Sequence, residues 1–158
     1  MKIFKKITVI KEITSKQSIM TNNRADIDNI SKETLVDLFS TATYGSNWLG
    51  ITVLRSEDHL DNIFSKEYLD DRCLDDVWAD RLLNGGHIVC LDWYAAEDND
   101  DNSPDEFKID LNSLKEKLKL ARDKEAVRDW CDFVLEEDDY FTCNNLMQVV
   151  MFDEVIYG

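Results

Sequence analysis

The excess of carboxylates constrains this chain more than any other feature of its sequence. The chain has 158 residues, with 33 Asp and Glu against 18 Lys and Arg, and a formal charge of −15. Residues 1–20 carry five lysines and one glutamate, so residues 21–158 carry −19. Any fold must keep these acids solvated or paired while it buries the hydrophobic residues, which make up 44% of the chain. That share of core formers is too high for a disordered chain, and the length suits one domain.

The negative charge also excludes classes of partner. DNA, RNA and anionic membranes would meet this chain with charge of the same sign, so direct binding to them is disfavoured. No apolar run approaches the roughly 20 residues that a membrane-spanning helix needs. Residues 1–20 lack the continuous apolar stretch of a secretory signal, so we expect an N-terminal strand or a loosely attached extension there. Residues 21–158 are expected to form a single acidic domain, and the four widely spaced cysteines are typical of buried free thiols in a cytoplasmic protein.

Three segments have the pattern of β-strands. Residues 48–54 and 87–94 are short apolar runs, and residues 107–111 alternate between apolar and polar side chains. Within the first run, Gly50 predicts a bulge or a close approach of another group. We expect the three strands to share one small mixed or antiparallel sheet of two to four strands.

About five helices are predicted around that sheet, on one of its faces. Each is recognised by apolar residues at intervals of three and four or by a residue suited to cap it. The expected helices run from Ser31 to near Gly45, from Ser56 over a short stretch, over 68–83, from a capping box of Ser113 and Glu116, over 127–135, and from Thr142 through 150. Residues 149–152 would also suit a strand, but we predict helix there. The fold class is therefore α+β.

One enzyme hypothesis comes from the end of the second strand. Asp92 followed by Glu106, Phe107 and Lys108 resembles the arrangement of restriction-type nucleases, in which two carboxylates hold Mg²⁺ and a lysine positions the attacking water. Acidic chains produce such a loose match by chance, and little basic surface is present to hold a phosphate backbone. We keep this metal-dependent nuclease as an alternative. The simpler interpretation is a strand flanked by solvated acids.

Calcium and zinc motifs are incomplete. Asp98, Asp100 and Asn102 match the first three ligand positions of a calcium loop, but the sixth position is Ser103 and the twelfth is Ile109, which excludes an EF-hand.

His87, Cys90 and Cys73 could supply three zinc ligands, but the paired cysteines of a zinc knuckle are missing. The sequence has no glycine-rich phosphate loop, and neither of its two histidines has an obvious partner for nucleophilic catalysis. We therefore predict no metal, no cofactor and no catalytic residue.

The leading hypothesis is a non-enzymatic acidic binding protein, an inhibitor that places carboxylates where the phosphates of a nucleic acid would lie. Its partner would be a basic protein, a nuclease or another nucleic-acid-binding protein, as for immunity proteins and anti-defence proteins of phages or mobile elements. The predicted partner-binding residues are Asp98, Asp100, Asp101, Asp105, Glu106, Glu136, Glu137, Asp138, Asp139, Asp76, Asp80 and Tyr94. Of Trp93 and Tyr94, one is expected in the core and the other as a half-exposed ring at the end of the strand, with one ring at the lip of the acidic loop as the alternative. The tryptophans as a group are expected in the core. A further alternative is an acidic structural or scaffold subunit whose charge only keeps it soluble.

Overall fold

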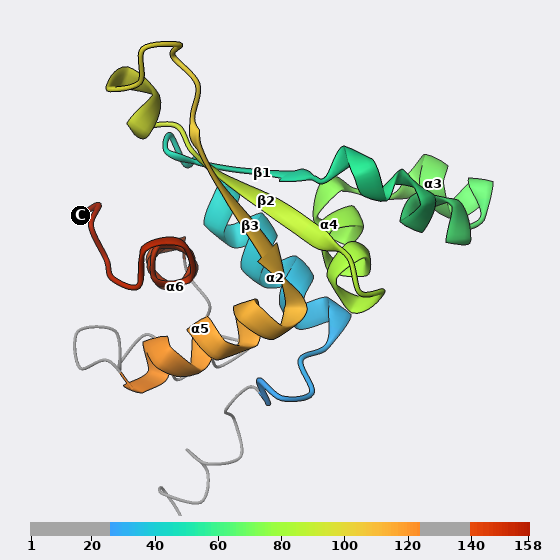
Figure 1. Cartoon of the computed structure of the whole chain (residues 1–158). Coiled ribbons are helices and arrows are strands. Elements are labelled where there is room, and N and C mark those ends of the chain that lie inside the picture. The colour runs from blue at the N-terminus through green and yellow to red at the C-terminus, as the bar shows by residue number, and fades with distance from the viewer. Residues whose placement is uncertain (1–25, 124–139) are drawn as a thin grey trace, which may run out of the picture.

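The protein is an α+β fold built on a three-stranded antiparallel sheet. The computed structural model describes residues 26–123 and 140–158. The sheet has the order β1-β2-β3, formed by β1 (Leu49–Val53), β2 (His87–Asp92) and β3 (Asp105–Asp110). The long helices gather on one face of the sheet, with α2 and α4 crossing behind the strands in Figure 1. All three predicted strands are confirmed.

The strand register fixes which side chains share a face. Leu49, Asp92 and Asp105 lie side by side at one end of the sheet, and His87 pairs with Asp110 at the other. Because side chains alternate along a strand, every second residue faces the helices. The core face carries Ile51, Val53, Ile88, Cys90, Phe107 and Ile109, and the opposite face carries Thr52, Val89, Leu91, Glu106 and Lys108.

The first described helix follows the sequence prediction closely. Helix α2 (Lys32–Thr43) begins after Ser31, whose Oγ accepts a hydrogen bond from the backbone N–H of Thr34 at 3.1 Å. The predicted apolar stripe is fully buried, and Gly45 follows the helix with a φ of +68°. This left-handed backbone favours glycine, which explains why the helix ends there.

The predicted helix over 68–83 is wrong in one respect, because it is two helices. Helix α3 (Lys66–Asp71) and helix α4 (Leu74–Leu83) are separated by Arg72 and Cys73, which both have extended backbone. The short helix expected after Ser56 is the 3₁₀ segment η1 (Arg55–Ile63), and the residue before it is Leu54. A second 3₁₀ turn, η2 (Ala95–Glu97), opens the connection from β2 to β3.

The capping box predicted at Ser113 and Glu116 starts three residues earlier. Helix α5 (Leu111–Asp123) follows Asp110, whose Oδ1 accepts from the Ser113 backbone N–H at 2.7 Å. The Ser113 Oγ in turn accepts from the Asp110 backbone N–H at 3.1 Å, so Asp110 and Ser113 form the reciprocal pair.

Helix α6 (Tyr140–Phe152) confirms a helix rather than a strand at the end of the chain, and Thr142 lies inside it. The predicted N-terminal strand, the helix over 127–135 and the acidic run at 136–139 lie outside the described residues.

The core lies between the sheet and helices α2, α4, α5 and α6. Trp48 and Trp78 belong to it, at 4% and 8% exposure, as predicted for the tryptophans. Trp93 does not, because it follows β2 on the opposite face, where its ring lies against Gly50. A Cβ on Gly50 would stand 2.8 Å from the Trp93 Nε1, so Gly50 marks the close approach that the sequence suggested.

Over residues 26–123 and 140–158, no helix has the length and apolar composition needed to cross a bilayer.

Candidate functional site

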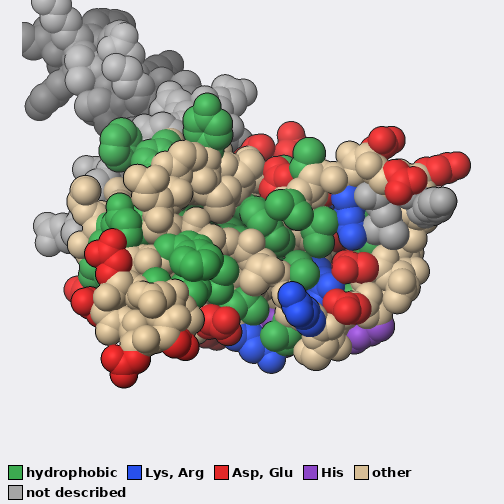
Figure 2. Space-filling model, turned by 90° about the horizontal axis from the view of Figure 1, so that it is seen from above, with side chains coloured by type: hydrophobic (Ala, Val, Ile, Leu, Met, Phe, Trp, Pro, Cys, Tyr) green, Lys and Arg blue, Asp and Glu red, His purple; other side chains and the backbone are tan. Residues whose placement is uncertain are grey.

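Charged side chains gather at both ends of the sheet, but in two different states. At the end where β1 leads into η1 and β2 begins, acids and bases from several elements contact one another. We call this group the paired-charge cluster, and its members are Lys32, Glu57, Asp58, Asp61, Tyr68, Arg72, Asp76, Asp80, Arg81 and His87. At the other end, the connection between β2 and β3 projects away from the helices (Figure 1). Figure 2, seen from above, shows acidic side chains at both ends of the face and hydrophobic ones between them.

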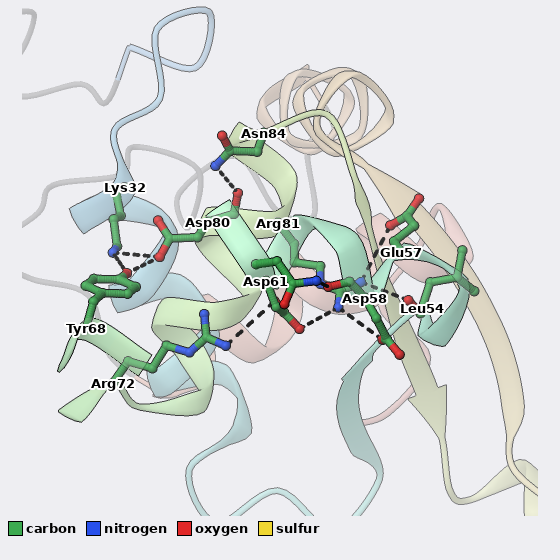
Figure 3. Close-up of polar contacts among 11 residues, drawn as sticks. Lys32, Leu54, Glu57, Asp58, Asp61, Tyr68, Arg72, Asp80, Arg81 and Asn84 are labelled. Carbon is green, nitrogen blue, oxygen red and sulfur yellow. Dashed lines mark hydrogen bonds and ion pairs between the residues drawn. The ribbon is translucent and has the colours of Figure 1, made fainter. Parts of the chain in front are cut away.

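Arg81 is the centre of the paired-charge cluster. It comes from α4, and its side chain is 1% exposed. Nη1 donates to the Leu54 carbonyl and Nη2 to the Asp61 carboxylate, each at 2.8 Å (Figure 3). Asp58 and Glu57 lie within 3.6 Å and 3.9 Å of the same guanidinium. A buried arginine is costly without such partners, so these acids of η1 stabilise the fold by pairing with it.

Two further pairs extend the cluster. The other oxygen of Asp61 lies 3.7 Å from Nη2 of Arg72. Glu57 Oε1 lies 2.6 Å from His87 Nδ1, and Glu57 Oε2 accepts from the His87 backbone N–H at 2.7 Å. Burial would raise the pKa of Glu57, but the hydrogen bonds from His87 outweigh it and hold the pKa below its ordinary value.

Lys32 of α2 joins α4 to α3. Its Nζ lies 3.0 Å from Asp80 and 3.2 Å from Asp76, and it also donates to the Tyr68 hydroxyl, which donates to Asp80 (Figure 3). Burial would lower the pKa of Lys32, but the hydrogen bonds with Tyr68 and Asp80 outweigh it, so the pKa is raised. Asp80 is 6% exposed, and both acids are held by the lysine. Asp80 is therefore too buried to meet a partner directly, whereas Asp76 stays at the surface with its carboxylate paired to Lys32.

The acids of the β2–β3 connection are in the opposite state. We call them the hairpin carboxylates; all are exposed, and they are Glu97, Asp98, Asp100, Asp101, Asp105 and Glu106. The ion pairs among the described residues include none of the six.

Two of the hairpin carboxylates shape the loop itself. Asp101 Oδ1 accepts from the Ser103 backbone N–H at 3.0 Å, and Asp105 accepts from the Asn99 side chain at 3.0 Å. The hydrogen bonds from Ser103 lower the pKa of Asp101. The side chains of Glu97, Asp98, Asp100 and Glu106 make no hydrogen bond among residues 26–123 and 140–158, so they remain available to a partner.

Beside the hairpin carboxylates lies a cleft of about 260 Å³, which we call the aromatic cleft. Its lining residues are Gly45, Asn47, Trp48, Tyr94, Tyr140, Phe141, Asn144, Asn145, Val155, Tyr157 and Gly158. The ring of Tyr157 lies 5.2 Å from that of Trp48 and packs edge to face with Tyr94 at 5.0 Å. Tyr94 is 44% exposed and Phe141 is 71% exposed. Tyr94 therefore lies where the alternative prediction put one ring, at the lip of the acidic loop. Trp93 is exposed as well, so the prediction that one ring of this pair lies in the core is wrong.

Gln148 and Asp92 hold the last residues of the chain against this cleft. Gln148 of α6 is fully buried, and its Oε1 accepts from the backbone N–H groups of Ile156 and Tyr157 at 2.8 and 2.7 Å. Its Nε2 donates to the Tyr157 carbonyl at 3.0 Å. The Tyr157 hydroxyl donates to Asp92 Oδ2 at 2.7 Å, and burial together with Asp92 raises the pKa of this phenol. Gln148 is not among the predicted site residues, although a glutamine between Met147 and Val149 is unusual in a core and was the available signal.

The nuclease hypothesis requires Asp92, Glu106 and Lys108 on one face, and the register separates them. Asp92 pairs with Asp105 and points towards the helices, whereas Glu106 and Lys108 point to the opposite face. Asp92 is also 4% exposed and bonded to Tyr157. These positions cannot hold one metal ion between the two carboxylates, so the predicted alternative site is not assembled.

The zinc combination fails for the same reason. His87 and Cys90 lie on opposite faces of β2, and burial raises the pKa of the Cys90 thiol to about 12. Cys73 is exposed at the start of α4, where its sulfur and the carboxylates of Asp75 and Asp76 lie within 4.8 Å of one another. Since Lys32 already holds Asp76, this group gives no evidence of a metal site.

No protein-family model matches this chain, and the searches of curated proteins and of solved structures also found no match.

Proposed function

We propose that this chain is a non-enzymatic binding protein that uses the hairpin carboxylates to bind a basic protein. The surface it meets would be one that otherwise binds nucleic-acid phosphates, so the chain would act as an inhibitor by mimicry. The observation that carries this proposal is the contrast in pairing. Bases contact the three acids of η1 and two of the three acids of α4, whereas the exposed hairpin carboxylates have no basic partner in the described chain.

Physical considerations support this use of the hairpin end. Exposed carboxylates without a counter-ion create a negative potential that attracts a cationic surface and accelerates association. The segment from Asp92 to Glu106 contains seven acids and no base, so nothing within it weakens that potential. The neighbouring aromatic cleft supplies ring surface, which is typical of protein interfaces.

Affinity capture with matched variants tests the proposal. The wild-type chain is immobilised and compared with a hairpin variant, Asp98→Asn/Asp100→Asn/Glu106→Gln, which replaces three carboxylates that make no hydrogen bond among the described residues. The control, Glu67→Gln/Asp70→Asn/Asp71→Asn, removes the same charge from exposed positions of α3. We expect the hairpin variant to capture its partner about tenfold more weakly, because each lost pair is worth up to about 1 kcal/mol, and the α3 control to retain most of the capture.

Competition then decides whether the partner surface is one that binds nucleic acid. Duplex DNA added to the wild-type complex should release the captured protein, and capture should weaken between about 50 and 200 mM salt. Equal losses from the hairpin variant and the α3 control would support the scaffold alternative, in which only the total charge counts. A partner that DNA does not displace would contradict mimicry.

A further inference from the structure

The aromatic cleft is adjacent to the hairpin carboxylates, but its shape and chemistry differ from theirs. Tyr94 lines it and directly precedes η2, the turn that opens the β2–β3 connection. Its volume of about 260 Å³ lies below the roughly 300–1,000 Å³ of small-molecule pockets. A cleft of this size fits one side chain of a partner better than a cofactor.

The lining is suited to a flat cationic group. Rings come from Trp48, Tyr94, Tyr140, Phe141 and Tyr157, and the described lining contains no Lys, Arg or His. An aromatic ring attracts a cation to its face. The side-chain oxygens of Asn144 and Asn145 already accept from Trp48 and Gln148, so the exposed Asn47 is the lining asparagine whose amide oxygen can accept a hydrogen bond from an incoming group.

The surroundings of the cleft are negative. Asp92 lies directly behind it, with Oδ2 bonded to the Tyr157 hydroxyl at 2.7 Å, and both Asp92 and Asp105 contribute to raising the pKa of that phenol. Four of the hairpin carboxylates follow Tyr94 within the next seven residues of the chain. A cation entering the cleft would therefore be attracted before it touches the rings.

We propose that the aromatic cleft receives an arginine side chain of the basic partner. Arginine is favoured over lysine because its planar guanidinium stacks on rings, donates several hydrogen bonds in its plane and is more weakly hydrated. The exposed rings of Tyr94 and Phe141 leave faces open to the incoming group. This inference rests on the proposed function, since it names the side chain that the acidic surface would bring into place.

Titration with a single residue tests the cleft without any partner. Nα-acetyl-arginine amide is added to the ¹⁵N-labelled full chain, and the indole N–H signal of Trp48 is followed by NMR. That N–H donates to Asn144 Oδ1 at 3.2 Å inside the cleft, so it reports on an occupant. We expect a saturable shift of this signal with the arginine derivative. The citrulline derivative has the same shape without the charge and should bind several-fold more weakly.

A pair of variants separates ring contact from general attraction. Tyr94→Leu keeps an apolar side chain but removes the ring, and it should weaken arginine binding by about two- to five-fold. Trp93→Leu removes a similarly exposed ring, 47% against 44%, that does not line the cleft, and it should leave binding unchanged. Equal binding of arginine and citrulline, or equal effects of the two variants, would overturn the proposal.

The result is distinguishable from a failure of the proposed function. If arginine does not shift the Trp48 signal while the hairpin variant still loses partner capture, only the cleft proposal is wrong. If arginine binds while the hairpin variant captures its partner normally, the acidic docking is wrong and the cleft is a separate arginine site.

Discussion

The two ends of the sheet carry similar numbers of acids and use them in opposite ways. At the paired-charge cluster, Lys32 of α2, Arg72 at the end of α3 and Arg81 of α4 contact the three carboxylates of η1 and two of the three in α4. At the hairpin end, none of the described bases pairs with the acids, and most of these side chains point into solvent. The number of acids in a segment therefore does not reveal their role. Their role depends on where the fold places the bases.

The strongest test of this comparison is the removal of the buried guanidinium. Arg81→Met should lower the free energy of unfolding by about 3–5 kcal/mol, because the substitution removes the only cation within 3 Å of Asp61 among the described residues and leaves that carboxylate with the longer 3.7 Å contact to Arg72. The Leu54 carbonyl also loses the hydrogen bond from the guanidinium. Urea denaturation measures the change. Lys108→Met, which removes an exposed cation from the opposite face of the sheet, is the matched control and should change stability by less than about 0.5 kcal/mol. Similar losses of stability for both variants would mean that the paired-charge cluster stabilises the fold no more than an exposed charge does.

A smaller loss is expected at the Lys32 contact. Asp80→Ala should cost about 2 kcal/mol, since it removes a buried acceptor of the Lys32 and Tyr68 hydrogen bonds, while Asp76 still pairs with the lysine. The same denaturation experiment measures this loss, and Asp100→Ala serves as the exposed control. If Asp80→Ala is neutral, the Asp76 and Asp80 face becomes a candidate binding surface again, and the contrast between the two ends weakens.

Acid titration tests the contact between Glu57 and His87 at the paired-charge cluster. The pKa of Glu57 is held below 4.5 in the folded protein by His87, so the unfolded state binds more protons as the pH falls. Glu57 therefore contributes stability above its unfolded pKa, and this contribution disappears as the pH falls through the folded pKa. Glu57→Gln should reduce the loss of stability between about pH 5 and pH 3, measured by urea midpoints. Glu67→Gln on α3 is the exposed control, and an equal effect there would show that His87 does not hold Glu57.

The sequence predicted much of the fold but only part of the difference between the paired-charge cluster and the hairpin carboxylates. The strands and the first helix were predictable because apolar alternation, a serine cap and a left-handed glycine are local signals. The break between α3 and α4 was not predictable, because the helical spacing of apolar residues continues past Arg72. In the structure, the Arg72 side chain contacts Asp61 and lies near the rings of Phe64 and Tyr68.

The candidate site divides in the same way. The base-free stretch that contains the hairpin carboxylates could be identified in the sequence, since nothing in it could pair them locally. The burial of Asp80 could not, because its partner Lys32 lies 48 positions earlier and meets it only when α2 packs on α4. The aromatic cleft joins Trp48, Tyr94 and Tyr157, which no spacing rule connects.

The smallest expected effect on stability belongs to the hairpin end. The variant Asp98→Asn/Asp100→Asn/Glu106→Gln should leave the urea midpoint unchanged or raise it slightly, because it removes repulsion and breaks no hydrogen bond among the described residues. The informative result is the combination of an intact midpoint with the loss of partner capture. That combination would show that these carboxylates contribute to binding and not to the stability of the fold. A clear loss of stability would instead place the hairpin carboxylates among the structural charges and erase the difference between the two ends of the sheet.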